Sequence, residues 1–87
     1  MHHVVAKGDE AAVRSRLDAG ADANVQDDDG ATPLHWAADR GLTSMAALLL
    51  EAGANHSIPD ESGMTPLHYA AMNDRDEVIK IEFLFTI

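Results

Sequence analysis

Residues 32–38 of this 87-residue chain read TPLHWAA, and residues 65–71 read TPLHYAA, so that the second copy begins 33 positions after the first. Only one letter differs, and it exchanges one aromatic residue for another. The same offset joins Gly20 to Gly53, and both glycines stand in an Ala-Gly-Ala triplet. A fixed period of this length is typical of stacked structural units.

The repeated phrase predicts the start of a helix. Thr32 can cap a helix through its hydroxyl, and Pro33 suits the first helical position, where its missing N–H costs nothing. One apolar stripe then follows at helical spacing, and it comprises Leu34, Ala37 and Ala38. The phrase is therefore expected to form a helix with one buried side.

A second helix is expected after Gly41, which breaks the first. Thr43 or Ser44 can start it, and its inward-facing residues would be Met45, Leu48 and Leu49. Gly53 stands where the end of a helix favours a left-handed residue, so we expect a positive φ there. Residues 58–64 are rich in turn-forming types. Each unit is thus predicted as helix, turn, helix and projecting loop.

The phrase T-P-L-H-x-A at a period of 33 resembles the ankyrin-repeat family, most specifically over residues 27–69. The resemblance implies an all-α solenoid of about three helix-turn-helix units with projecting β-turn loops. We expect one domain over residues 1–87, with units at approximately 1–26, 27–59 and 60–87. The first unit is expected to be clipped, with its inner helix in residues 1–7 and its outer helix near 9–19.

The outer helices of the flanking units depart from the central one. Leu49 has Arg16 one period before it and Glu82 one period after it. End units of a stack carry a more polar outer face, which would account for both charges. Alternatively, the register shifts by two over residues 78–85, and Phe83 and Leu84 then occupy the leucine positions.

Residues 34–41 and 65–70 also resemble the ankyrin region of large, multidomain acyl-CoA-binding proteins, in their order of Trp and Tyr and in the Asp-Arg-Gly after the first phrase. This closer resemblance implies an alternative function. The chain would be the ankyrin fragment of a lipid-ester carrier, and it would modulate or localise acyl-CoA binding by a separate domain. No such domain fits within 87 residues.

Charge and composition narrow the function further. The formal net charge of −9 disfavours nucleic acids as partners, because proteins that bind nucleic acids carry a basic patch. It disfavours binding to acidic membrane surfaces for the same reason. The chain has no cysteine, which suits a reducing, cytoplasmic setting. Its longest strongly apolar run, residues 45–50, is far shorter than the roughly 20 residues that cross a bilayer, and the N-terminus lacks the pattern of a signal peptide.

Neither catalysis nor a metal or other cofactor is expected. The ankyrin resemblance implies that the imidazoles of His35 and His68 bond within their own loops and to a neighbouring unit. No two of the five histidines have the i, i+4 spacing of a helical zinc site. The carboxylates that fall on the loops are expected to be solvated, and no nucleophile elbow or phosphate-binding glycine loop occurs.

The expected function is therefore a non-catalytic protein-interaction module. Trp36 and Tyr69, the variable pair of the phrase, either fill the groove between units or line the concave surface as anchors for a partner. The register of the family places ten further residues on that surface: Asp28, Asp29, Ala31, Asp39, Arg40, Glu61, Ser62, Met64, Met72 and Asn73. The acidic loop tips favour a protein partner with a basic surface.

Overall fold

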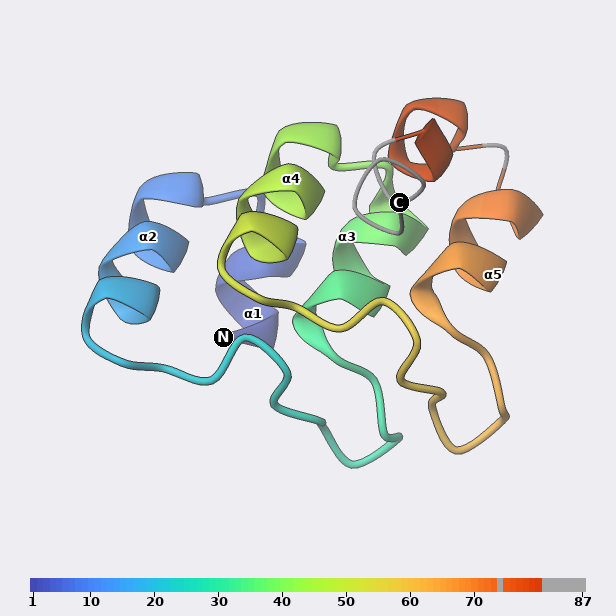
Figure 1. Cartoon of the computed structure of the whole chain (residues 1–87), viewed down its shortest axis with the longest axis horizontal. Helices are drawn as coiled ribbons and strands as arrows, with labels where there is room; N and C mark the ends of the chain where they lie inside the picture. Colours follow the sequence, from blue (N-terminus) through green and yellow to red (C-terminus); the bar gives the residue numbers. More distant parts are fainter. Residues whose placement is uncertain (74, 81–87) are drawn as a thin grey trace.

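The computed structural model describes residues 1–73 and 75–80, and the helices form a stack (Figure 1). The helices are α1 (His2–Ala6), α2 (Glu10–Asp18), α3 (Pro33–Arg40), α4 (Thr43–Glu51) and α5 (Pro66–Met72). Residues 76–80 are also helical, and they begin one period of 33 after the first residue of α4. Within the described residues there is no β-strand.

The inner helices pack side by side, with α3 between α1 and α5. Each outer helix packs against the inner helix of its own unit, α2 on α1 and α4 on α3. Figure 1 shows the loops after α2 and after α4 extending from the same side of the stack. We call their projecting turns, residues 27–31 and 60–64, the first and the second finger. The predicted all-α stack of helix-turn-helix units with projecting loops is confirmed.

The ends of the helices follow from local chemistry. The Thr32 hydroxyl accepts the backbone N–H of His35, and the His35 ring accepts the backbone N–H of Thr32, so two N–H groups at the start of α3 are satisfied reciprocally. Gly41 ends α3 with φ +69°, and Gly53 follows α4 with φ +94°, as predicted. The second helix does begin at Thr43, but its cap is Leu42, whose side chain makes no capping hydrogen bond.

The core lies between the helices of the central unit and their neighbours. Its buried side chains include the predicted inward-facing residues Leu34, Ala37, Ala38, Met45, Leu48 and Leu49. Val78, one period after Met45, is also fully buried, so the register holds up to that residue. Burying apolar surface of this kind is the main force that holds such a stack together.

In the first unit Arg16 is exposed, as expected if the end units of the stack have a more polar outer face. Its counterpart Glu82, together with the alternative register through Phe83 and Leu84, lies outside the described residues. None of the described helices combines the length and the apolar character that a membrane span requires.

Candidate functional site

The first finger is closed by the carboxylate of Asp27. Its Oδ1 accepts the backbone N–H groups of Asp29 at 3.0 Å and Ala31 at 2.9 Å. Its own backbone N–H donates to the carbonyl of Ala31, and its carbonyl accepts the N–H of Gly30, both at 2.9 Å. A short polar side chain that bonds backbone groups two and four residues later fixes the turn, as Asp commonly does in loops.

The second finger repeats this arrangement one period later. Oδ1 of Asp60 accepts the backbone N–H groups of Ser62 at 2.9 Å and Met64 at 3.0 Å. The two fingers also bond to each other, because the N–H of Glu61 donates to the carbonyl of Asp29 at 2.9 Å. The two fingers are therefore connected to each other, and the same hydrogen bonds from an aspartate carboxylate hold each one.

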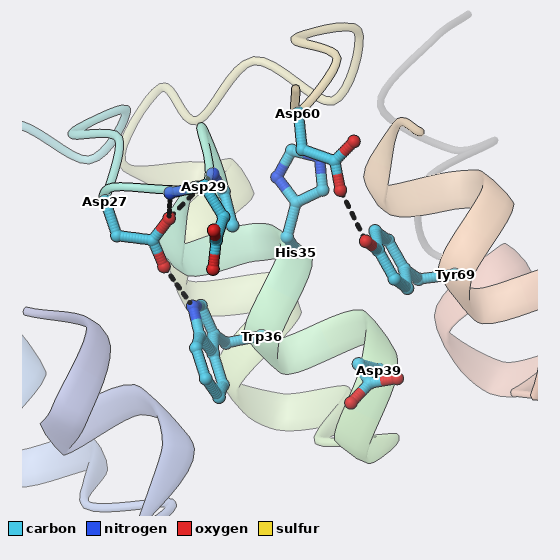
Figure 2. Close-up of a pocket in the computed structure, with 8 residues that line it drawn as sticks. Asp27, Asp29, His35, Trp36, Asp39, Asp60 and Tyr69 are labelled. Carbon is cyan, nitrogen blue, oxygen red and sulfur yellow. Dashed lines mark hydrogen bonds between the residues drawn. The ribbon is translucent and has the colours of Figure 1, made fainter. Parts of the chain in front are cut away.

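Each closing carboxylate also holds an aromatic side chain from the helix that follows it. The second oxygen of Asp27, Oδ2, accepts the indole N–H of Trp36 at 3.1 Å. Oδ2 of Asp60 accepts the hydroxyl proton of Tyr69 (Figure 2). Both rings are half-buried and pack against the hydrophobic core. The polar tip of each ring is thus bonded, and its orientation is fixed before any ligand arrives.

These bonds change the ionisation of the groups that make them. Burial works to raise the pKa of the Asp27 carboxyl, but the hydrogen bonds from Ala31, Trp36 and Asp29 outweigh it and leave the pKa below its ordinary value of 3.8. The hydrogen bond from Tyr69 lowers the pKa of Asp60, and the same bond raises the pKa of Tyr69 to about 12. At neutral pH both carboxylates are charged and Tyr69 is neutral.

The histidine of the phrase joins the two units. His35 is buried, and its Nδ1 accepts the N–H of Thr32 at 2.9 Å, so its Nε2 carries the proton and donates to the carbonyl of Met64 at 2.8 Å. His2 makes the matching contact one unit earlier, between its Nε2 and the carbonyl of Ala31 at 2.9 Å. The bonding that the resemblance implied for His35 is confirmed.

His68 is exposed, and among the described residues its ring bonds only to Thr65. No group of three histidine, aspartate or glutamate side chains within residues 1–73 and 75–80 is arranged to hold a metal ion.

A cleft opens between the two fingers and the inner helices α3 and α5. Its volume is about 180 Å³. Trp36 and Tyr69 line it from adjacent helices, and carboxylates surround them (Figure 2). The full lining comprises Asp27, Asp29, Ala31, His35, Trp36, Asp39, Asp60 and Tyr69. We call this site the aromatic–acidic cleft.

Five of the residues predicted for the concave surface line this cleft: Asp29, Ala31, Trp36, Asp39 and Tyr69. Seven others do not line it: Asp28, Arg40, Glu61, Ser62, Met64, Met72 and Asn73. Several of these surround it instead. The Asn73 amide donates to Oδ1 of Asp39 at 2.9 Å, and the Arg40 guanidinium carbon lies 6.0 Å from the centre of the Trp36 ring.

Asp28, Glu61 and Ser62 are exposed on the fingers, as expected for loop tips, whereas the Met64 carbonyl is used by His35. Met72 is the most exposed large apolar side chain in the described part of the chain, at 62%.

Asp27 and Asp60 orient the rings of the cleft, although neither is among the residues predicted for the concave surface. A signal was present, because each aspartate stands nine residues before the aromatic residue that it bonds, in both units. The sequence predicts only a structural role for His35, yet its ring also lines the cleft and meets the Tyr69 ring edge-on, with 5.7 Å between ring centres.

Comparison with known proteins agrees with the repeat pattern. A family model for ankyrin repeats in three copies matches residues 1–82. A search of curated proteins finds no matching sequence. The closer resemblance to acyl-CoA-binding proteins finds no support in the family match, and nothing in the described structure favours it.

Proposed function

Since the chain belongs to the ankyrin-repeat family, we propose that it is a non-catalytic module that binds a protein partner with a basic surface through its concave face. Ankyrin repeats are generally protein-interaction modules and are typically non-catalytic. The partner's basic character and the residues that contact it belong to our proposal. So does the cytoplasmic location that we expect from the sequence.

The proposal is supported most strongly by the composition of the aromatic–acidic cleft. It combines two half-buried rings with four carboxylates, Asp27, Asp29, Asp39 and Asp60, on one face of the stack. Aromatic side chains contribute much of the binding energy in protein interfaces, because they bury a large area at low entropic cost. Complementary charge around them selects the partner and speeds the encounter.

The finger tips extend the negative surface beyond the cleft. Asp28, Asp29 and Glu61 are exposed, and no Lys or Arg among the described residues forms an ion pair with them. In a chain of net charge −9 they should attract a basic partner over a range of about 8 Å at physiological ionic strength. Surface charges of this kind change stability little, so their effect should appear in the rate of association.

The test is stopped-flow association with a short peptide rich in arginine and lysine, at two salt concentrations. The tip variant Asp28→Asn, Asp29→Asn, Glu61→Gln should associate several-fold more slowly, and the difference should shrink at high salt. A matched variant removes three carboxylates from the outer helices instead, through Glu10→Gln, Asp18→Asn and Glu51→Gln. It should keep nearly the original rate.

Two results would contradict the proposal. One is association that does not depend on salt in the unmodified protein. The other is an equal loss of rate in the tip variant and in the outer-helix variant, because this would mean that net charge alone acts. A peptide of the same length with glutamine in place of every basic residue provides the baseline, and melting curves of all variants confirm that the fold is kept.

A further inference from the structure

The carboxylates of the aromatic–acidic cleft fall into two classes. Asp27 and Asp60 are engaged, since in each residue one oxygen accepts two backbone N–H groups and the other accepts an aromatic side chain. Asp39 has one oxygen bonded to the Asn73 amide. The Asp29 carboxylate accepts no hydrogen bond from a described residue. Asp29 and Asp39 therefore have carboxylate oxygens in the cleft lining that can still accept hydrogen bonds from a ligand.

No Lys or Arg lines the cleft to neutralise these two groups, and the one imidazole in the lining, that of His35, is already bonded to Thr32 and Met64. An apolar ligand would bury them without a partner, which costs free energy because a desolvated charge needs a counter-charge. A cation avoids that cost, and it is also attracted by the faces of the aromatic rings. Arg40 shows that a guanidinium is accommodated beside Trp36, with its central carbon 6.0 Å from the ring centre.

Among the cationic side chains, the arrangement fits arginine best. Guanidinium is planar and weakly hydrated, stacks on aromatic rings and forms two parallel hydrogen bonds with a carboxylate. The lysine ammonium is compact and strongly hydrated, and uses the rings less well. The cleft volume of about 180 Å³ suits a single side chain inserted between the fingers.

We propose that the aromatic–acidic cleft binds one arginine side chain of the partner, with the guanidinium beside the Trp36 and Tyr69 rings and hydrogen-bonded by Asp29 and Asp39. This inference rests on the proposed interaction function and names the chemical group that the concave face recognises. Asp27 and Asp60 act as positioning residues, because they hold the two rings and the two fingers in place.

The chain provides its own reporter for a test. Trp36 is its only tryptophan, so intrinsic tryptophan fluorescence reports directly from the cleft. Three peptides of identical flanking sequence carry arginine, lysine or citrulline at one central position, and citrulline has nearly the shape of arginine without its charge. The arginine peptide should change the fluorescence saturably and bind about tenfold more tightly than the citrulline peptide, with the lysine peptide between them.

The matched variants locate the binding. Asp29→Asn with Asp39→Asn removes the two available carboxylates while keeping their shape, and should weaken arginine binding about tenfold. Asp18→Asn with Glu51→Gln removes the same charge from the outer helices and should leave the affinity within about twofold of the unmodified protein. Melting curves of both variants establish that the comparison is made between folded proteins.

The outcomes separate this inference from the proposed function. Equal binding of the arginine and citrulline peptides would overturn the arginine site, and so would a lysine peptide that binds as tightly as arginine. Equal losses in the two variants would also overturn it. If these results came with salt-dependent association that Asp28→Asn with Glu61→Gln, at the tips outside the cleft, still slows, the basic-partner proposal would stand while the arginine site fell. If association also ignored the tips, both would fall.

Discussion

The two copies of the seven-residue phrase have nearly the same letters and very different surroundings. In the central unit Leu34, His35 and Ala38 are buried, at 0%, 2% and 0% exposure. In the third unit Leu67 is half-buried, and His68 and Ala71 are exposed. Both copies nevertheless make the same cap, in which a threonine and a histidine bond each other's backbone N–H groups.

The comparison separates what a unit determines locally from what its neighbours supply. The helix, its cap and the closing aspartate of the finger form in both units, because they depend only on residues within one period. Burial of the apolar stripe depends on a helix packed against each side, and α3 has α1 and α5 as neighbours. The stability of the stack should therefore be concentrated in the central unit.

The largest effect is expected for Leu49→Ala, because Leu49 is a fully buried side chain of α4, the outer helix of the central unit, and its truncation opens a cavity. Truncating a buried leucine typically lowers the free energy of unfolding by about 2–5 kcal/mol. Arg16→Ala, at the same register position in the first unit but with an exposed side chain, should change it by less than about 0.5 kcal/mol. Urea unfolding of both variants measures this difference, and similar losses would refute a concentrated core.

The histidines offer a matched pair within the phrase itself. His35→Ala leaves the buried N–H of Thr32 and the carbonyl of Met64 without their partner, which should lower the free energy of unfolding by about 1–3 kcal/mol. His68→Ala removes the partner of only one backbone N–H, that of Thr65, and this bond is already exposed to water, so the variant should cost clearly less. If denaturation curves showed that His68 matters as much as His35, burial would not be the source of the difference.

The glycines of the two fingers, Gly30 and Gly63, are a second matched pair one period apart. Gly30 and Gly63 have φ values of +77° and +83°, so an alanine at either position is strained by about 1 kcal/mol. A Cβ at Gly30 would also lie 3.0 Å from the backbone nitrogen of Glu61, whereas nothing lies within 4 Å at Gly63. Melting curves should show a larger loss for Gly30→Ala. Equal losses would mean that the fingers separate at little cost.

A smaller effect concerns the ionisation of Tyr69, the only tyrosine of the chain. Its pKa is raised to about 12 by the hydrogen bond to Asp60, so its contribution to stability is complete below pH 10 and is lost as the pH rises from about 10 to about 12. The ultraviolet absorbance of tyrosinate gives this pKa directly. Asp60→Asn should move it back toward 10, and an unchanged value would contradict the bond.

Much of this structure could be predicted from the sequence, because the helix caps and turns depend on nearby residues and the same residues recur after 33 positions. The phrase, Gly41 and Gly53 located the helices of the central unit, and the spacing identified its buried leucines. Two features were not predicted. The cap of α4 is Leu42, whose side chain cannot accept a backbone N–H, so no residue type marks it. The bond between Asp27 and Trp36 recurs at the same spacing in the next unit, but the spacing alone does not show that the finger folds back against the helix.

We expect the partner to bind the face that the second and third units form together. Two-dimensional amide NMR of the unmodified protein, titrated with the arginine peptide, tests this claim most directly. We expect chemical-shift changes in residues 27–31 and 60–64 and around Trp36, Asp39 and Tyr69, on both sides of the aromatic–acidic cleft, with little change in α2 and α4. Shifts confined to the outer helices, or to only one of the two units, would contradict it.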